Sequence, residues 1–165
     1  FLAGYPRIVN AAGPLTHLGG TLMRPETVQA MADASAHFLD IAELQAWASK
    51  VIADVTGAEA GYVTSGAAAA LTLAAAACIA GLNPRIMEEL PFTQARNEII
   101  IARPHRNSYD HSLRAAGAKL VEVGFDDRAA GAGIRGPEIW EFEAAITRVS
   151  IRVDRVPPNR SMVFS

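Results

Sequence analysis

The sequence predicts an α/β domain with a mostly parallel sheet and helices on both faces, preceded by an N-terminal arm and helices. Short apolar runs alternate with helical patterns, which is typical of a parallel sheet. The chain has 165 residues, of which 50% are hydrophobic, enough to bury a core. We expect an arm over residues 1–24, the α/β domain over 25–148, and a divergent or truncated tail over 149–165.

Capping signals and periodicity predict each element in order. Residues 1–20 hold prolines and glycines without a stable period, so we expect an extended arm. A helix should begin at Pro25, a favoured first helical position, and end near Phe38. A second should begin after Asp40, repeat apolar residues every 3.6 positions, and stop at Gly57. Further along we expect strands over 61–64, 98–102 and 119–123, helices over 66–80, 108–116 and 137–146, a short helix from Asn83-Pro84 to Leu90, and a surface loop over 124–136. Trp47 and Trp140 lie at helical spacing with other apolar residues and are expected to be core or interface anchors.

Composition and spacing argue against several classes of protein. The net charge of −2 gives no basic field for nucleic acid, which argues against tRNA as a substrate. A single cysteine allows no disulfide framework and favours a reducing cytoplasm. The most apolar run, residues 67–80, is shorter than the about 20 residues of a membrane span, so we expect no membrane partner. The four histidines and the cysteine show neither C-x-x-C nor H-E-x-x-H spacing, so we expect no metal site.

The segment AEAGYVTSGAAAA at 58–70 is the most informative. It is typical of a strand, a tight polar turn and an abrupt helix start. Ser65 is expected to cap the helix with its hydroxyl, while Gly66 and Ala67 leave their N–H groups accessible, so the turn could bind a phosphate. An ordinary strand-to-helix connection is the alternative. A hydrolase is disfavoured because Val63 and Ala67 stand where the G-x-S-x-G elbow needs glycines.

A second polar cluster, HRNSYDH at 105–111, follows the strand expected to end at Ala102. Ligands of open α/β sheets collect outside the carboxyl ends of the strands. An imidazole or phenol ring there could stack on the ring of a ligand. The structural alternative is that Ser108 caps the next helix, whose first turn carries the other polar side chains in solvent.

Four stretches of the chain occur in the same order in one enzyme group. They are RIVNAAG at 7–13 followed by THLGG at 16–20, VTGAE at 55–59, TSGAAAA at 64–70, and DHSLRAAGAKLVEVG at 110–124. By these motifs the chain resembles the pyridoxal-phosphate (PLP) enzymes of the selenocysteine synthase (seryl-tRNA selenium transferase) and D-glucosaminate-6-phosphate ammonia-lyase group. The YDH and TSGAAAA wording resembles the ammonia-lyase-like branch more than the tRNA-dependent, selenium-transferase branch.

The resemblance implies that residues 25–148 are the N-terminal part of a fold-type-I PLP-transferase (aminotransferase-like) large domain. It implies that the cofactor phosphate binds at Ser65, Gly66 and Ala67. It makes His105 the first candidate to stack on the cofactor ring, with Tyr109 and His111 behind it. It also implies a homo-oligomer in which the arm reaches a neighbouring active site through Asn10, Thr16 and His17.

The function implied by the resemblance is that of a PLP-dependent lyase or transferase. Its substrate would be an amino acid or amino sugar acid, with elimination or transfer at Cβ. No catalytic residue is identifiable: the lysines are Lys50 and Lys119, and the family's Schiff-base lysine and pyridine-partner aspartate come after the part that this sequence covers. We therefore expect an incomplete N-terminal portion, inactive and marginally stable alone, whose strand over 61–64 lacks its usual partners. The alternatives are a non-catalytic α/β domain binding another phosphorylated ligand at the Ser65 helix, and a remnant without a ligand.

Overall fold

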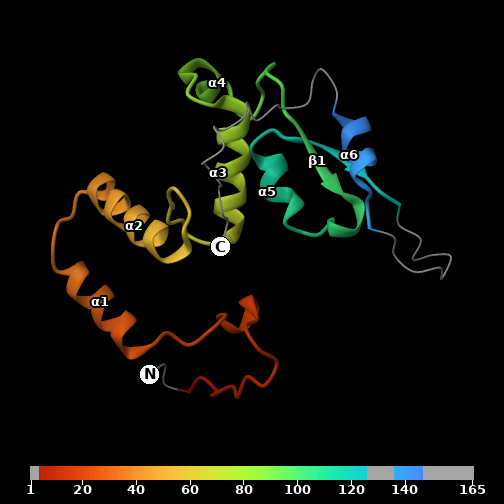
Figure 1. The fold of residues 1–165 in the computed structure, drawn as a ribbon. Coiled ribbons are helices and arrows are strands. Elements are labelled where there is room, and N and C mark those ends of the chain that lie inside the picture. Colours follow the sequence, from red (N-terminus) through yellow and green to blue (C-terminus); the bar gives the residue numbers. More distant parts are fainter. Residues whose placement is uncertain (1–3, 126–135, 147–165) are drawn as a thin grey trace. The chain divides into compact units, whose positions relative to one another are not determined.

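A computed structural model of the chain describes residues 4–125 and 136–146, and its helices and strands are shown in Figure 1. Two compact units divide the chain, residues 1–44 and 45–165. The expected tail over 149–165 and most of the expected loop over 124–136 lie outside the described residues. No helix within the described ranges has the length and apolar character needed to cross a membrane.

The first unit contains the arm and the first helix. The arm is extended apart from a single turn of 3-10 helix, Thr16–Leu18, which ends at Gly19 with a positive φ of 85°. Helix α1, Pro25–Ser35, begins at the predicted proline but stops before the predicted Phe38. The side chain of Ser35 donates a 2.7 Å hydrogen bond to the carbonyl of Ala32 in its last turn.

Helix α2, Ile41–Thr56, begins and ends where the sequence predicts. The Asp40 carboxylate accepts hydrogen bonds from the amides of Ala42 and Glu43, at 2.8 and 3.1 Å, which satisfies two donors that have no partner inside the helix. Gly57 follows the helix with a φ of +74°, a conformation that favours glycine.

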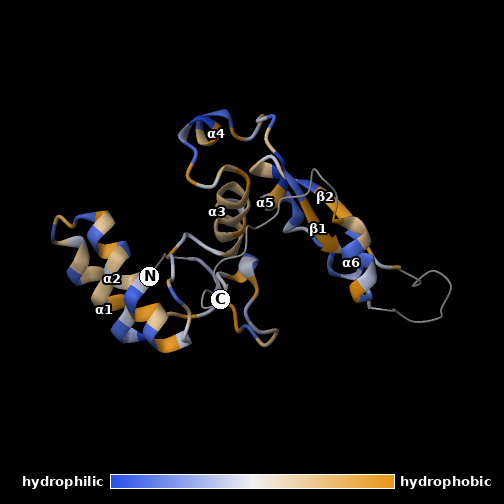
Figure 2. Ribbon diagram, turned by 45° about the horizontal axis from the view of Figure 1, so that its top comes forward, coloured by the Kyte–Doolittle hydropathy of each residue, from blue (hydrophilic) through white to orange (hydrophobic). Residues whose placement is uncertain are grey.

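The second unit is an α/β arrangement around a parallel strand pair, as predicted. Strands β1, Glu98–Ala102, and β2, Lys119–Val123, have the predicted bounds and pair in parallel, from Glu98 opposite Lys119 to Ala102 opposite Val123. The helices of this unit are α3, Ala67–Ala80, α4, Pro84–Glu89, α5, Asp110–Ala115, and α6, Ile139–Ala145. Helix α3 packs against α4 and α5, and α6 packs against β2. Figures 1 and 2 both show α3 and α5 on one side of the strands and α6 on the other.

Local hydrogen bonds explain where the shorter helices begin. Asn83 caps α4 by accepting from the amides of Arg85 and Ile86, as the Asn-Pro signal predicts. Helix α5 begins at Asp110 rather than Ser108, because the Asn107 side chain accepts a hydrogen bond from the amide of Tyr109 and holds the chain in a turn before the helix. Helix α6 begins at Ile139 rather than at residue 137, because Glu138 and Glu141 form a reciprocal capping box.

The turn between α5 and β2 requires glycine at position 117. Gly117 has a φ of +94°, and a Cβ placed on it would lie 2.2 Å from the carbonyl oxygen of Pro91. Its own carbonyl accepts a 2.7 Å hydrogen bond from the side chain of Asn97, just before β1. This close approach joins the segment preceding β1 to the start of β2.

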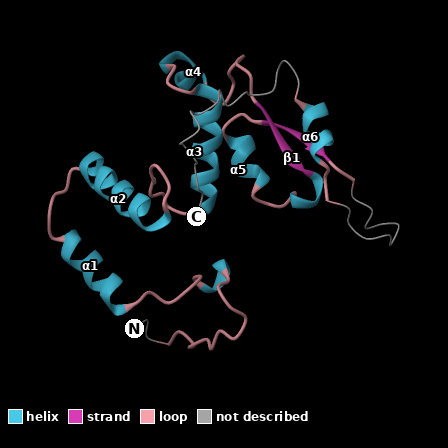
Figure 3. Cartoon of the chain, in the orientation of Figure 1, coloured by secondary structure: helices cyan, strands magenta, loops and turns pink. Residues whose placement is uncertain are grey.

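The predicted strand over 61–64 is wrong: this segment belongs to the connection between α2 and α3, drawn as loop in Figure 3. Strands need a neighbour for their backbone groups, and the described sheet consists of β1 and β2 alone. Side chains of α2 take over that role. Gln45 donates to the carbonyl of Val63 at 2.7 Å and accepts from its amide at 3.1 Å, and Ser49 accepts from the amide of Gly61 at 3.1 Å.

The core of the described residues is built from small side chains. The buried apolar residues are alanines, apart from Ile79 at the end of α3 and Val123 at the end of β2. Trp47 and Trp140 are 66% and 62% exposed, so the expectation that they anchor a core is wrong within the described structure. Their expected role at an interface stays a prediction.

Candidate functional site

The start of α3 is open and accessible. Gly66 is the N-cap residue, with a φ of 137°, and a Cβ placed on it would meet no atom within 4 Å. The predicted cap by Ser65 is wrong, because no side chain among the described residues caps this helix. The hydroxyl of the preceding residue, Thr64, bonds this turn instead: it donates to the carbonyl of Gly66 at 3.0 Å and accepts from the amide of Gly66 at 3.4 Å. Ser65 is therefore left exposed beside the helix terminus.

The first-turn amides of α3 are available to a ligand. An α-helix leaves its first N–H groups without an intrahelical acceptor. The described residues offer no acceptor to the amides of Ala67, Ala68 and Ala69, whereas the amide of Ala70 donates to the carbonyl of Gly66 at 3.0 Å. These amides lie at the positive end of the helix dipole, and Gly66 and Ala67 are exposed. The geometry therefore suits an anion such as a phosphate group.

The turn before α3 is held by α2 rather than by a sheet. Two of its contacts are the Gln45 and Ser49 hydrogen bonds already described. Gly61 also lies so close to α2 that an added Cβ would sit 2.5 Å from Cγ2 of Ile52. Because Gln45, Ser49 and Ile52 lie on one face of α2, this helix sets the path of the chain into Gly66.

The second cluster lies where β1 ends. A 3-10 turn, Arg103–His105, follows the strand directly. The Asn107 side chain donates to the carbonyl of His105 at 3.0 Å and accepts from the amide of Tyr109 at 2.8 Å. Asn107 therefore shapes the backbone on both sides of the cluster, a role that the sequence reasoning missed.

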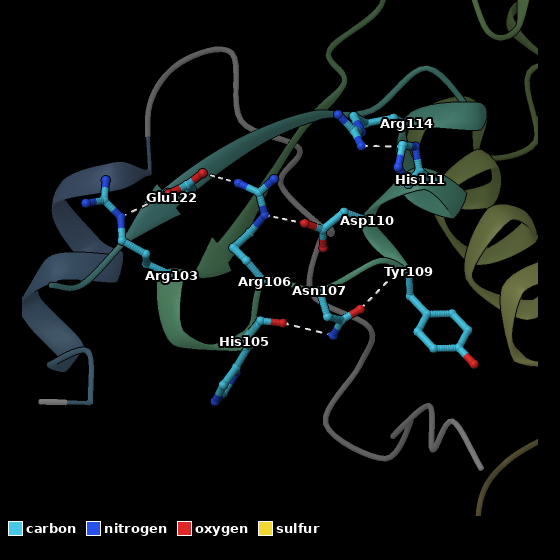
Figure 4. Close-up of polar contacts among 9 residues, drawn as sticks. All are labelled: Arg103, His105, Arg106, Asn107, Tyr109, Asp110, His111, Arg114 and Glu122. Atoms are coloured by element: carbon cyan, nitrogen blue, oxygen red, sulfur yellow. Dashed lines mark hydrogen bonds and ion pairs between the residues drawn. The ribbon is translucent and has the colours of Figure 1, made fainter. Parts of the chain in front are cut away.

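Charged side chains support this cluster from behind (Figure 4). Asp110, at the start of α5, is buried and forms an ion pair with Arg106. The same guanidinium pairs with Glu122 of β2, which also accepts from Arg103 at 2.9 Å. The hydrogen bond from Arg106 holds the pKa of Asp110 below its ordinary value, and the same bond raises the pKa of Arg106.

The three predicted ring residues of the cluster do not lie together. Figure 4 shows the His105 and Tyr109 side chains extending away from the ion pairs on the same side. His111 turns toward Arg114 instead, with 3.1 Å between His111 Nδ1 and Arg114 Nη2. His105 and Tyr109 are exposed. The structure therefore leaves His105 and Tyr109 exposed at separate places in the cluster and turns His111 toward α5.

Both candidate regions lie at one end of the second unit. Helices α3 and α5 pack side by side, and the Thr72 hydroxyl of α3 donates to the carbonyl of Ser112 of α5 at 3.0 Å. Figure 1 shows the two helices running in the same direction, with their N-termini at the end where β1 and β2 finish. The Ser65–Ala67 turn and the His105–Tyr109 segment thus share the end of the sheet at which α/β proteins bind ligands.

The arm residues belong to the first unit. Asn10 forms a local turn, donating to the carbonyl of Gly13 at 2.7 Å and accepting from the amide of Ala12 at 2.9 Å. Thr16 and His17 lie in the 3-10 turn of the arm. Their contribution to an active site stays a prediction.

No metal-binding group is found in the described ranges, where no three histidine, cysteine, aspartate or glutamate side chains gather as ligands. The residues that the sequence reasoning missed are Gln45, Arg106, Asn107 and Glu122. The polar residues at i and i+4 of α2, and the acidic residue between two valines of β2, are the signals that could have pointed to Gln45 and Glu122.

Comparison with known proteins gives two curated relatives, while no protein-family model matches the chain. The chain is 32% identical over 148 residues to D-glucosaminate-6-phosphate ammonia lyase of Salmonella typhimurium (strain 14028s / SGSC 2262), covering 87% of this chain and 38% of that protein. It is 32% identical over 127 residues to 5'-C-glycyluridine monooxygenase-decarboxylase of Streptomyces sp, covering 73% of this chain and 32% of that protein.

A solved structure of D-glucosaminate-6-phosphate ammonia-lyase has the same fold. It superposes with a TM-score of 0.81 at 29% identity, over 90% of this chain and 39% of that chain. The chain therefore spans under two fifths of the length of the proteins that it matches.

Proposed function

Because the chain belongs to the D-glucosaminate-6-phosphate ammonia-lyase-like group, we propose that it forms the cofactor-phosphate-binding part of a PLP-dependent lyase or transferase. The proposed substrate is an amino sugar acid or a related amino acid, with elimination or transfer at Cβ. We also propose a homo-oligomer in the cytoplasm, with no tRNA partner. The sequence similarity supports the class of reaction, and the open start of α3 supports the cofactor.

The observation that carries this proposal is the accessible first turn of α3 beside the carboxyl ends of the strands. Within the described part of the chain, the amides of Ala67 to Ala69 have no acceptor and Gly66 is uncovered, which suits a phosphate dianion. The exposed Ser65 hydroxyl can donate a further hydrogen bond. The residues present therefore fit the phosphate group of PLP.

The second cluster suits the ring of the same cofactor. His105 and Tyr109 offer exposed flat side chains at the end of the sheet that also carries the phosphate turn. When bound, PLP withdraws electrons from the substrate carbon that carries the amino group, which weakens bonds at that carbon and allows departure at the next one. In this proposal His105 lies on the ring, Tyr109 and His111 remain further candidates, and Asn10, Thr16 and His17 contribute from an arm.

Neither lysine of the chain belongs to the two candidate regions. Lys119 begins β2, at the opposite end of the strand pair from His105. Lys50 lies within α2 and is exposed. We therefore propose that these residues bind and orient the cofactor, and that this chain alone, as an incomplete N-terminal portion of the enzyme, is inactive.

The alternative function is a non-catalytic α/β domain that binds another phosphorylated ligand at the same helix terminus. Backbone amides recognise the phosphate and not the group attached to it, so the geometry of α3 is equally compatible with this alternative. The two functions differ in what the ring contributes to affinity.

The test is a titration of the 165-residue chain with PLP, followed by NMR of the backbone amides. We expect the largest shifts at residues 66–69, with weaker binding of inorganic phosphate and no shifts at these amides with pyridoxal, which lacks the phosphate. Gly66→Ala should weaken PLP binding because a side chain is strained at a φ of 137°. Gly81→Ala is the matched control, because Gly81 also has a positive φ and free space but follows the other end of α3.

The outcomes separate the two functions. Equal affinity for PLP and for a phosphate ester without an aromatic ring, such as glucose 6-phosphate, would favour the non-catalytic domain. Shifts that avoid residues 66–69 altogether would contradict both.

A further inference from the structure

A network of four charged side chains lies behind the turn that carries His105 (Figure 4). Its members are Arg103, the first residue of the turn, Arg106, which follows the turn, Asp110 at the start of α5, and Glu122 on β2. The two positive and two negative charges balance. The network therefore adds no net charge to the site, and its geometry is what bears on the turn.

Glu122 is the residue that joins the two ends of the turn. Its Oε2 accepts from Arg103 Nε at 2.9 Å, and its Oε1 accepts from Arg106 Nη1. One carboxylate thus binds both arginines, with one oxygen for each, while only Pro104 and His105 lie between them in the chain. Such charge-assisted hydrogen bonds are stronger than bonds between neutral groups.

Burial makes this network more than a pair of surface charges. The Asp110 side chain is 7% exposed and that of Arg106 is 31% exposed. A buried carboxylate is costly unless it is paired, so Asp110 requires Arg106 to stay in place. Arg106 is consequently held by Asp110 through Nε and by Glu122 through Nη1.

Glu122 lies on a strand that is paired with β1. Glu122 is the next-to-last residue of β2, whose last residue, Val123, pairs with Ala102, the last residue of β1. The turn with His105 starts at the very next residue, Arg103. Glu122 therefore fastens the turn to the neighbouring strand at the point where β1 ends.

The His105 ring is the part of this turn left free. Its backbone carbonyl accepts from Asn107, but within the described residues the ring makes no hydrogen bond and is exposed. The Asn107 hydrogen bond and the ion pairs of Arg103 and Arg106 with Glu122 thus hold the chain on both sides of His105, while its ring faces outward. That combination suits a residue that presents a flat surface to a ligand.

We propose that Glu122 is a positioning residue of this site: by binding Arg103 and Arg106 together, it fixes the turn that presents His105 to the ring of the cofactor. This inference rests on the proposed function, because it takes the ring of PLP as the ligand of His105. Glu122 itself lies behind the turn and touches no reacting atom.

The test uses Glu122→Gln in the 165-residue chain, which keeps the shape of the side chain but removes its charge. Glu89→Gln is the matched control, because Glu89 forms an ion pair of 2.9 Å with Arg85 on α4, away from the turn. Two quantities are measured for both variants and the unaltered chain. They are amide hydrogen exchange over residues 103–110 and the dissociation constants of PLP and inorganic phosphate.

We expect faster exchange over 103–110 in Glu122→Gln alone. PLP binding should weaken roughly two- to tenfold, the range expected for losing a well-placed ring contact. Inorganic phosphate should bind Glu122→Gln as it binds the unaltered chain, because the amides of α3 do not depend on Glu122. Unchanged phosphate binding also shows that the variant is folded.

Two results would overturn the inference. One is exchange over 103–110 that matches the control, and the other is a loss of PLP affinity no greater than the loss for phosphate. Failure of the proposed function looks different, because the unaltered chain would then bind neither ligand at residues 66–69, and the positioning role would fall with it.

Discussion

Asp110 is the only ionisable side chain that is buried in the described ranges. The free-energy cost of burying this carboxylate is offset by its ion pair with Arg106, four residues earlier in the chain. Gly66 shows the opposite situation, a positive φ with no neighbour near its missing side chain. One position is fixed by a charge pair and the other is kept open, and both lie at the end of the unit where the strands finish.

Acid should remove the contribution of Asp110 to stability. Arg106 holds the pKa of Asp110 below its ordinary value in the folded state, so on acidification the unfolded chain takes up this proton first. The free energy of unfolding should therefore fall as the pH drops below about 4 and through the folded-state pKa. At neutral pH, Asp110→Asn should be less stable than the unaltered chain, and this difference should shrink toward about pH 3.

Urea unfolding followed by circular dichroism at several pH values measures this difference. Asp54→Asn is the control, because Asp54 is an exposed carboxylate on α2. It should follow the unaltered chain at every pH. A difference between Asp110→Asn and the unaltered chain that stays constant with pH would exclude the ion pair as its source.

The elements that the sequence predicted correctly have apolar runs or capping residues within their own stretch of chain. Strands β1 and β2 were predicted by short apolar runs, and α2 and α4 by the capping residues Asp40 and Asn83. The Ser65–Ala67 turn and the 105–111 cluster were singled out for the same reason, since glycine, serine and histidine stand out in a local pattern, and their binding roles stay predictions. These features depend on residues close together in the chain.

Most of the features that the sequence analysis predicted wrongly or missed depend on distant contacts. Whether residues 61–64 form a strand is decided by a neighbouring strand, and the described neighbours are instead Gln45 and Ser49 of α2. Glu122 was missed because its partners lie 16 and 19 positions away. The predicted Ser65 cap failed because the Thr64 hydroxyl bonds the turn instead. The contacts of Gln45, Ser49 and Glu122 join residues far apart in the chain, whereas the Thr64 bond is a local turn that competes with the predicted cap.

Gln45 should be needed to hold the turn that leads into α3. Gln45→Ala removes both hydrogen bonds to Val63, at 2.7 and 3.1 Å, and leaves two backbone groups without their partner. The expected cost is about 1–2 kcal/mol of unfolding free energy, with faster exchange of the Val63 amide. Gln29→Ala is the control, because Gln29 bonds only the exposed Asp33 on α1. Equal exchange of the Val63 amide in both variants would show that α2 does not hold this turn.

At the scale of the whole molecule, small buried side chains contrast with large exposed ones. The buried apolar residues of the described chain are alanines together with Ile79 and Val123. Hydrophobic stabilisation grows with the apolar area removed from water, so alanines contribute little of it. The described sheet has two strands, each with an open edge. Two parallel strands and a core of alanines provide little stabilisation against the conformational entropy of the unfolded chain.

The isolated 165-residue chain should therefore be marginally stable. Small domains usually melt cooperatively at about 45–65 °C. We expect a broad transition below this range, because few large side chains would lose contacts together on unfolding. We also expect a hydrophobic dye to bind before the transition, because Trp47, Trp140 and other large apolar side chains are exposed. Differential scanning calorimetry measures the transition, and a van't Hoff enthalpy well below the calorimetric one would show the loss of cooperativity. A sharp transition above about 60 °C would contradict this prediction. It would mean that the apolar residues exposed in the described structure are packed against one another or against a second copy of the chain. The sedimentation coefficient of the same sample distinguishes these two forms of packing.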